Sequence, residues 1–488
     1  MRLNYIANAL GLILTDIGLV TFIPIAVAIY YKEWGSILPF FAAGILSIFV
    51  GDVLRKVVKN ASDTDALNDI KKSEALMIVS SAWMLFGIVA AVPYLFFGLL
   101  PIDALFEGVS GVTTTGATIL TNLDFPHTLI FWRSFTQWLG GMGIIVLFVA
   151  ILPQFAVAGR QMFFAEAPGP TEDKMTPRIK NTASALWLVY GGLTILCTLA
   201  LWFAKMNLFD AICNSMSTVS AGGFSPHYAS ISGYNSNIVI WIIALFMFLS
   251  GTSYILQSRV LTKRKLSLLW KSEEFKCYTG LVVSFSIILA LVLILDHEYS
   301  IGQSITAAVY QVLSLSTSTG SSSENYHLWS FNAKIILFIA MFISSSSGSA
   351  GGGLKIARWI LIFKYVKNEL YKILHPNAVL SIKIDGKVVA TDVIRQTLFF
   401  TFCFFGLWAL TAVILTCLEQ NIVIGVTSSI ASIGDIGPAF GSVIGPLGNY
   451  STLKDASKVI LIFNMLVGRL EIIPFLVLFH KDFWKIKG

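Results

Sequence analysis

Four short segments of the chain carry residue types that can coordinate a cation. They read Thr113-Thr114-Thr115-Gly116, Val219-Ser220-Ala221-Gly222, Thr317-Ser318-Thr319-Gly320 and Gly434-Asp435-Ile436-Gly437. Rings of backbone carbonyl oxygens can replace the hydration shell of potassium, and glycine adopts the backbone angles that turn successive carbonyls toward one axis. The hydroxyl groups before the glycines add oxygen ligands. The segments therefore predict a cation filter of the potassium type.

The predicted filter takes three residues from each segment, and potassium is the metal expected there. An ordinary loop is the alternative for any one segment, but four of them in corresponding places favour the filter. Asp435 is the one acid within them, and it either attracts cations at the mouth or caps the strand. The predicted filter residues are Thr114, Thr115, Gly116, Ser220, Ala221, Gly222, Ser318, Thr319, Gly320, Asp435, Ile436 and Gly437.

The segments recur at nearly regular intervals, which indicates an internal repeat. The glycines that close them, Gly116, Gly222, Gly320 and Gly437, are 106, 98 and 117 residues apart. Each segment follows a short apolar stretch, whereas a helix that crosses a bilayer needs about 20 residues. We expect these stretches to be half-helices whose negative C-terminal ends favour a cation. They are residues 101–113, 207–218, 302–316 and 421–432.

The composition places the segments in a membrane protein. Of the 488 residues, 56% are hydrophobic and 12% are charged, and the mean hydropathy is +0.76, which excludes an ordinary soluble domain. The first apolar stretch is too long for a cleavable signal peptide, so it is predicted to remain a membrane helix. We expect about ten spans, among them 5–30, 76–99, 182–204, 276–295, 333–347 with a continuation beyond a break, 396–417 and 458–480.

Basic residues gather beside the apolar stretches, which is the positive-inside pattern of membrane proteins. This pattern accounts for the net charge of +7 without a nucleic-acid partner and predicts both termini in the cytoplasm. The five cysteines show no CxxC spacing, so neither a metal cluster nor a disulfide framework is indicated. The predicted cytoplasmic clusters are Arg55, Lys56, Lys59, Lys71 and Lys72; Arg160, Lys174, Arg178 and Lys180; Arg259, Lys263, Arg264, Lys265, Lys271 and Lys276; and Lys355 to Lys387.

The repeats and the spans together predict an all-α integral membrane protein. Four pseudo-repeats of helix, pore half-helix, filter and helix surround one pore, because non-helical backbone at membrane depth must be buried in protein or line an aqueous path. The predicted parts are two N-terminal transmembrane helices in 1–70, pore repeat 1 in 71–165, repeat 2 in 166–265, repeat 3 with an intramembrane gate loop in 266–385, and repeat 4 in 386–488.

A run of ten small residues, 344–353, interrupts an apolar stretch of the third repeat. Its helix propensity is poor. We interpret the run as a mobile gate below the filter, and a kink or a close helix contact through small residues is the alternative. The predicted gate residues are Ser346, Ser347, Gly348, Gly351, Gly352 and Gly353.

Two arginines lie in or beside apolar stretches. Arg469 lies inside the apolar run 459–479, where a charge is costly and by default functional. It is predicted to contact the gate or to repel cations, and an ion pair with Glu471 or another acid is the alternative. Arg133 is predicted near the outer interface in a structural role, and the Gly140-Gly141-x-Gly143 cluster is predicted to allow close helix approach.

Several stretches resemble the Trk/Ktr/HKT superfamily of potassium transporters, and within it the bacterial TrkH/TrkG type of membrane subunit. Besides the four filter segments they are Phe131 to Gly143, Glu166 to Arg178, His375 to Val388 and Gly468 to Glu471. The resemblance implies a potassium uptake pore in the bacterial inner membrane. It also implies a homodimer and cytoplasmic TrkA-type nucleotide-binding regulatory subunits. Potassium is then the transported ion, and no cofactor is expected on this chain.

The sequence departs from the family pattern at Asp435 and at the serine run Ser321-Ser322-Ser323, which leaves the passage of sodium or rubidium open. The alternative function is an alternating-access secondary transporter that binds a small solute at broken helices. All four half-helices are predicted to enter from the outer side, which counts against inverted repeats. The chain has no HExxH motif or Ser/His/Asp set, so an enzyme is not expected.

Overall fold

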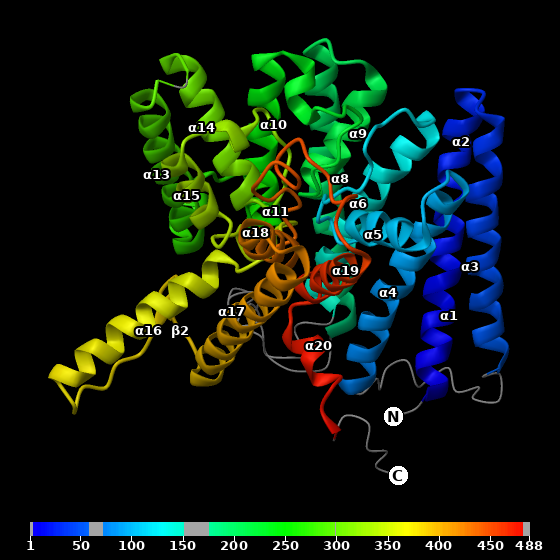
Figure 1. The fold of residues 1–488 in the computed structure, drawn as a ribbon. Coiled ribbons are helices and arrows are strands. Elements are labelled where there is room, and N and C mark those ends of the chain that lie inside the picture. The colour runs from blue at the N-terminus through cyan, green and yellow to red at the C-terminus, as the bar shows by residue number, and fades with distance from the viewer. Residues whose placement is uncertain (1–2, 58–71, 151–174, 298, 482–488) are drawn as a thin grey trace.

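The computed structural model describes residues 3–57, 72–150, 175–297 and 299–481, and these are mostly helical (Figure 1). One small antiparallel hairpin joins β1 (Lys383–Ile384) to β2 (Lys387–Val388). The helices are α1 (Leu3–Val20), α2 (Ile23–Tyr30), η1 (Trp34–Ser36), α3 (Ile37–Val57), α4 (Lys72–Phe96), α5 (Pro101–Val112), α6 (His127–Ala150), α8 (Met175–Phe203), α9 (Leu208–Val219), η5 (Ser230–Tyr234), α10 (Asn237–Ser250), α11 (Tyr254–Lys263), α12 (Ser267–Lys271), α13 (Glu273–Leu295), α14 (Ile301–Ser316), η6 (Tyr326–Leu328), α15 (Phe331–Ala340), α16 (Ile356–Leu374), α17 (Thr391–Glu419), α18 (Ile422–Ile433), α19 (Asp455–Arg469) and α20 (Ile473–Val477).

Some of the sequence expectations fall on residues outside these ranges. They are the boundaries 70/71 and 165/166, most of the stretch Glu166 to Arg178, and the basic residues Lys59, Lys71, Arg160 and Lys174.

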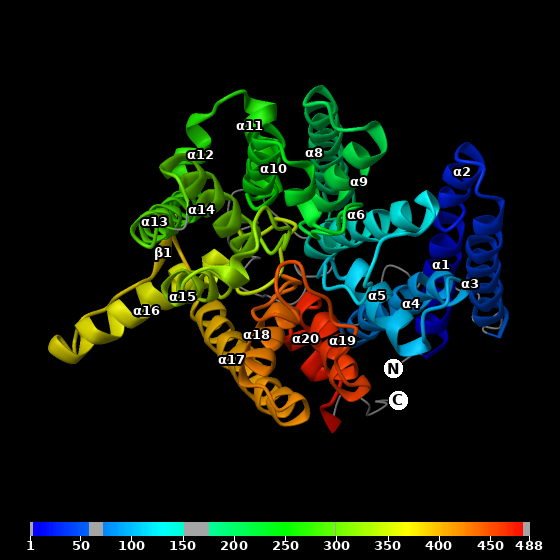
Figure 2. The same ribbon diagram turned by 45° about the horizontal axis from the view of Figure 1, so that its top comes forward.

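Helices α1 to α3 form an N-terminal hairpin that stands beside the other helices (Figures 1 and 2). Two glycines allow the close approach, because a methyl group added at Gly11 or at Gly51 would lie 2.6 Å from the other residue's carbonyl oxygen. The Ser47 hydroxyl donates a hydrogen bond to the Leu14 carbonyl at 2.7 Å. The hairpin is therefore joined by small and hydroxylated residues, as is common between membrane helices.

The helices that follow the hairpin gather in four groups around a common centre, which Figure 2 shows from above. Each group holds a long helix, a short helix and a returning helix. The groups, in chain order, are α4-α5-α6, α8-α9-α10, α13-α14-α15 and α17-α18-α19.

The short helices begin at clear local signals. Pro101 occupies the first turn of α5, and Asn207 accepts a hydrogen bond from the Asp210 amide at the start of α9. Ser300 and Gln303 form a capping box at α14, and Asn421 accepts from two amides of α18. Asparagine, serine and proline are favoured at these positions because they satisfy or remove free N–H groups. The expected half-helices are confirmed as short helices whose C-terminal halves are buried.

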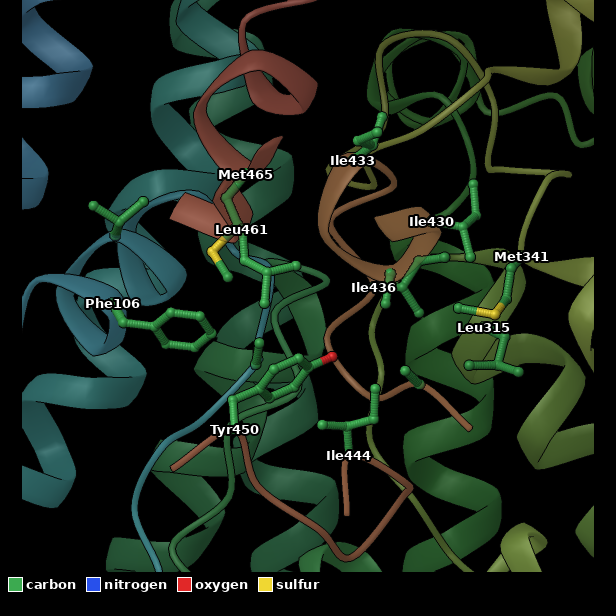
Figure 3. Packing of buried hydrophobic residues seen from close by; sticks show 14 of the residues in the cluster. Phe106, Leu315, Met341, Ile430, Ile433, Ile436, Ile444, Tyr450, Leu461 and Met465 are labelled. Carbon is green, nitrogen blue, oxygen red and sulfur yellow. The ribbon is translucent and has the colours of Figure 1, made fainter. Parts of the chain in front are cut away.

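The apolar core joins groups that are far apart in the sequence. Figure 3 shows Phe106 of α5 beside Tyr450, Leu461 and Met465 of the fourth group. The ring centroids of Phe106 and Tyr450 are 5.5 Å apart. The same figure shows Leu315 of the third group next to Met341 and close to Ile436. The short helices are thus held against their neighbours by side chains that face the centre.

Six helices in the described ranges are long and apolar enough to cross a membrane, and the bent pair α10 and α11 raises the number to seven. The sequence predicted about ten. Part of the difference arises where returning helices are broken: α10 and α11 meet at 93°, and α15 ends at Ala340. The expected continuous span 458–480 is wrong, because α19 ends at Arg469 and the backbone of Glu471 and Ile472 has positive φ.

A carboxylate from the N-terminal hairpin caps α6. Glu33 accepts hydrogen bonds from the His127 and Thr128 amides at 2.8 and 3.0 Å and from the Thr128 hydroxyl at 2.6 Å. Burial tends to raise the pKa of Glu33, but the bonds from Thr128 and His127 outweigh it and hold the pKa below its ordinary value of 4.5. A carboxylate at a helix N-terminus also interacts favourably with the helix dipole.

We expect Glu33→Gln to lower the melting temperature of the purified protein at neutral pH. Because the folded-state pKa of Glu33 is below 4.5, its stabilisation is complete above that pH and is lost as the pH falls through the folded-state value. The deficit of the variant should therefore shrink below about pH 4.5. Thermal unfolding over a pH series measures this, with Glu369→Gln, at a partly exposed position of α16, as control. An unchanged deficit at low pH would contradict the cap.

Candidate functional site: a ring of four backbone segments

The four half-helices end in the same backbone conformation. In each, the residue after the helix is followed by one with positive φ and, two residues later, by a glycine with positive φ. The first of these positive-φ residues is Thr114, Ala221, Ser318 or Asp435, and the glycine is Gly116, Gly223, Gly320 or Gly437.

This alignment shifts the second segment by one residue from the sequence expectation. Gly223, with φ +76°, takes the place that corresponds to Gly116, and Gly222 takes the place of Thr115. The four-residue segments are therefore 113–116, 220–223, 317–320 and 434–437, and we call them the ring segments. Their residues occupy positions one to four.

Matching hydrogen bonds support the alignment. The amide at position two bonds to a carbonyl three residues back, and the amides at positions three and four bond to a second carbonyl of the same helix. In the first group the acceptors are Gly111 and Ser110, with distances of 3.0 Å from Thr114, 3.0 Å from Thr115 and 3.5 Å from Gly116. This is the Schellman ending of a helix, in which a left-handed residue is normally glycine. None of the four residues here is glycine.

The ring segments contact one another in a closed cycle. A methyl group added to the position-four glycine of each group would come closer than 3.0 Å to the position-three carbonyl oxygen of the next group, a distance that real side chains essentially never show. The pairs are Gly116 with Gly222, Gly223 with Thr319, Gly320 with Ile436, and Gly437 with Thr115. The structure therefore brings all twelve sequence-predicted filter residues into one ring.

Hydrogen bonds beyond the ring segments close the same cycle. They are Arg133 Nη1 to the Ser225 carbonyl at 3.4 Å, the Ile231 amide to the Ser322 carbonyl at 3.1 Å, the Tyr326 hydroxyl to the Ala439 carbonyl at 3.2 Å and the Tyr450 amide to the Thr118 carbonyl at 2.8 Å. The serine run that departs from the family pattern takes part, because Ser322 also donates its amide to the Ser230 hydroxyl. Groups one to four are thus joined in chain order, and the fourth returns to the first.

Asp435 lies on the side of the ring that faces Gly352. Its Oδ1 accepts a hydrogen bond from the Thr115 hydroxyl at 3.0 Å, and a methyl group at Gly352 would lie 2.8 Å from its Oδ2. Oδ2 has no hydrogen-bond partner among the described residues, and neither has the Thr114 hydroxyl. Two oxygens at position two are therefore buried without a hydrogen bond.

Gln137 of α6 holds the second ring segment. Its Nε2 donates to the Gly222 carbonyl at 2.6 Å, and its Oε1 accepts from the Phe224 amide at 3.1 Å. The side chain is completely buried, so loss of the amide would leave two backbone groups without partners. The sequence alone gave Gln137 no role.

Arg133, which the sequence predicted near the outer interface in a structural role, is 3% exposed. It forms an ion pair at 2.9 Å with Glu107 of α5, which is fully buried. Glu107 also accepts from the Thr118 hydroxyl and the Ile119 amide, each at 3.0 Å. The guanidinium lies 4.1 Å from the centre of the Phe224 ring. Both charges can be buried beside the first two ring segments because each is paired with the other.

The Ser/Gly run 344–353 lies directly beneath the ring. The Gly352 amide donates to the Ser318 hydroxyl at 2.7 Å. Methyl groups at Gly351 and Gly352 would lie 2.6 and 2.7 Å from the position-one carbonyl oxygens of Thr317 and Gly434. These glycines permit a close approach of two backbones, so the run, which we call the gate loop, covers two groups of the ring.

Other contacts fix the gate loop from the sides. The Ser346 amide donates to the Gly251 carbonyl at 2.9 Å, and the Ser347 amide donates to Glu274 at 2.5 Å. Lys355 is also buried, and its ammonium donates to the Gly351 carbonyl and to two serine hydroxyls of the loop. Sequence analysis had counted Lys355 with a cytoplasmic cluster. The signal that would have placed it is its position two residues after Gly353, the last of three consecutive glycines.

Arg469 reaches the gate loop from α19. Its two terminal nitrogens donate to the carbonyls of Ala350, at 3.0 Å, and Gly140, at 3.1 Å. The alternative of an ion pair with Glu471 is wrong, since Glu471 pairs with Arg358. Arg469 thus ties the loop to the first group, where Gly140 itself packs against the Val112 carbonyl. The expected close approach at the Gly140-Gly141-x-Gly143 cluster is confirmed.

A cavity of about 70 Å³ opens on the other side of the ring. Gly116, Gly223 and Gly320 line its base, and Arg133 and Tyr450 lie in its wall. No group of three or more acidic, histidine or cysteine side chains with the geometry of a metal site occurs in the described part of the chain.

These features define a polytopic α-helical membrane protein with a ring of extended backbone at its centre. A family model described as TrkH, cation transport protein, matches residues 37–486. The chain belongs to this family of cation transport proteins, which excludes the enzyme alternative.

Relatives match over nearly the whole chain. The Trk system potassium uptake protein TrkH of Escherichia coli K12 is 38% identical, with 99% of this chain and 100% of the relative covered. The Trk system potassium uptake protein TrkG of the same strain is 31% identical, with 95% and 94% covered. The crystal structure of the potassium transporter TrkH from Vibrio parahaemolyticus aligns with a TM-score of 0.88 at 30% identity and covers 99% of this chain and 100% of that one.

We expect Arg133→Met to destabilise the protein by about 3–5 kcal/mol, because it leaves the buried Glu107 charge without its partner. The double variant Arg133→Met/Glu107→Gln should recover much of this loss, since no uncompensated charge remains. Thermal or denaturant unfolding of the detergent-purified proteins measures both. Equal destabilisation by the single and the double variant would contradict the ion pair.

Proposed function

We propose that this chain is a potassium uptake pore, in which potassium crosses the bacterial inner membrane through the centre of the ring segments. The closed cycle of position-four glycines and position-three carbonyls is the observation that carries the proposal. It surrounds an axis with backbone oxygens from four directions, as a potassium filter requires. The names of the relatives, potassium uptake proteins and a potassium transporter, support potassium as the ion.

The gate loop and Arg469 form the proposed gate. The loop covers the ring from the side opposite the cavity at Gly116, and Arg469 fastens it to the first group through Ala350 and Gly140. Conduction then requires the loop to move and these two hydrogen bonds to break. The gate residues are Ser346, Ser347, Gly348, Gly351, Gly352, Gly353 and Arg469.

The proposed assembly is a homodimer with cytoplasmic TrkA-type nucleotide-binding subunits, and both termini of the chain are cytoplasmic. The second half of α16 supports an interface between copies, because it points away from the other helices (Figure 1). Its exposed apolar residues include Val366, Leu370 and Ile373. An alternating-access transporter of a small solute is disfavoured, because four groups in one cycle do not form the inverted pair that such transporters use.

Gly320→Ser should reduce the preference for potassium over sodium about tenfold. A non-glycine residue at φ +72° carries a strain of roughly 1–2 kcal/mol, and about 1.4 kcal/mol corresponds to a factor of ten. The added side chain also meets the Ile436 carbonyl. Competition of rubidium uptake by potassium and sodium in proteoliposomes measures the preference.

Gly302→Ser is the matched control for this test. Gly302 belongs to the same group, and a methyl group there would meet nothing within 4 Å. If Gly320→Ser and Gly302→Ser show the same ion preference as the unmodified protein, the ring is not the filter.

Arg469→Ala should raise rubidium flux in the absence of any cytoplasmic partner. It removes two hydrogen bonds from a charged group, each worth about 1.5–3 kcal/mol, so the loop should leave the ring at least about tenfold more often. Arg469→Lys keeps the charge but not the two-pronged geometry. High flux in both variants indicates a tether, and high flux in the alanine variant alone indicates an electrostatic barrier. Unchanged rubidium flux in both folded variants would contradict the assignment of Arg469 to the gate.

A further inference from the structure

A second cavity, of about 540 Å³, lies beside the gate loop on the side away from the ring. Ser346 and Ser347 of the loop form part of its wall. The remainder comes from α11, α12, the start of α13 and the β1–β2 turn, and its lining residues include Ile255, Leu256, Arg259, Lys263, Leu268, Lys271, Glu274, Phe275 and Asp385. The cavity is the product of the sharp bend between α10 and α11.

The acidic and the basic side chains of this cavity differ in whether they already have partners within the protein. Both acids are engaged with backbone amides: Glu274 accepts from Ser347 at 2.5 Å, and Asp385 accepts from Glu273 at 2.7 Å. The Lys263 and Lys271 ammonium groups have no ion-pair partner within the described residues. Arg259 adds a third positive charge to the lining. Lys263 and Lys271 therefore present positive charge without an ion-pair partner in the described residues, next to carboxylates that already accept hydrogen bonds.

Apolar residues give the same cavity a second character. Ile255, Leu256, Leu268 and Phe275 line it together with the basic groups. The helices around it also expose large apolar side chains, Leu261 by 61%, Leu266 by 72% and Trp270 by 60%. A short helix with exposed apolar and basic side chains is typical of the membrane interface, where tryptophan is also enriched.

We propose that this cavity binds the phosphate of an anionic phospholipid and that the bound lipid acts on the gate loop. Basic pockets between membrane helices on the cytoplasmic side are suited to anionic headgroups, and the apolar wall suits the adjoining acyl chain. The inference rests on the proposed function for its orientation and for the meaning of the gate. Lys263 and Lys271 hold the phosphate, and Arg259 adds to the field.

The contact with the gate loop gives the site its regulatory consequence. The Ser347 amide is held by Glu274 at the boundary of the cavity. A phosphate placed among the lysines repels the Glu274 carboxylate and offers the Ser346 and Ser347 N–H and hydroxyl groups other acceptors. Lipid binding therefore weakens one of the contacts that hold the loop beneath the ring, and it favours the open state.

Two measurements on the full-length protein test the site. Native mass spectrometry counts phosphatidylglycerol molecules retained after purification, and rubidium uptake is compared in vesicles of phosphatidylcholine with and without phosphatidylglycerol. We expect phosphatidylglycerol to raise uptake and Lys263→Gln to weaken its binding about fivefold, the equivalent of about 1 kcal/mol for one basic residue near an anionic surface. Lys263→Gln/Lys271→Gln should abolish the response of uptake.

The chain supplies matched controls for this experiment. Arg264 and Lys265 follow Lys263 directly but do not line the cavity, so Arg264→Gln/Lys265→Gln should leave lipid binding and the response intact. Equal losses in the two double variants would overturn the site in favour of general surface attraction. Inorganic phosphate that reproduces the response in phosphatidylcholine vesicles would overturn the lipid as the ligand. If the protein binds the lipid but shows no rubidium uptake, the result counts against the proposed function and not against the lipid site.

Discussion

The contact between a glycine and the next group's carbonyl oxygen is the constraint on which the ring depends. Extended backbone at the centre of a membrane protein leaves polar groups that neither lipid nor helix can satisfy. Here each segment is closed against its neighbour at Gly116, Gly223, Gly320 and Gly437, and its amides return to the half-helix from which it emerges. The groups cannot separate without exposing those segments, so the half-helices, their caps and the core of Figure 3 serve to hold one ring together.

Several buried cations around the ring are paired with acids, and others donate to backbone oxygens. Arg133 pairs with Glu107 inside the first group, whereas Arg358 pairs with Glu471, and Lys458 of the fourth group pairs with Asp103 of the first at 2.6 Å. Lys355 and Arg469 instead donate to carbonyls of the gate loop and its neighbourhood. Breaking a buried pair costs more than the pair contributes, so these contacts fix how the groups are arranged more than they add to stability.

The sequence was most informative where a structural feature requires one particular residue type. Glycine recurrence located the segments, and the short apolar stretches located the half-helices. The sequence placed the second segment one residue too early, because Ala221-Gly222-Gly223 offers two glycines. Only the positive φ of Gly223 distinguishes the two. The sequence also mistook broken helices for continuous spans, since hydropathy does not register a turn at Leu470–Ile472. Gln137 was passed over because its partners, Gly222 and Phe224, lie 85 and 87 residues away in the chain. The pairing of Arg133 with Glu107, 26 residues away, was not foreseen, and Lys355 was misread because its contacts depend on how the gate loop folds back.

The left-handed residue that ends each half-helix is Thr114, Ala221, Ser318 or Asp435, so one backbone geometry carries four different side chains. A ring assembled from four identical chains would have to repeat any substitution on every side. Because all four segments of this ring belong to one polypeptide, a mutation alters one quarter of the ring and leaves three unchanged. One quarter can accordingly hold an acid such as Asp435, whereas four acids at this position would repel one another.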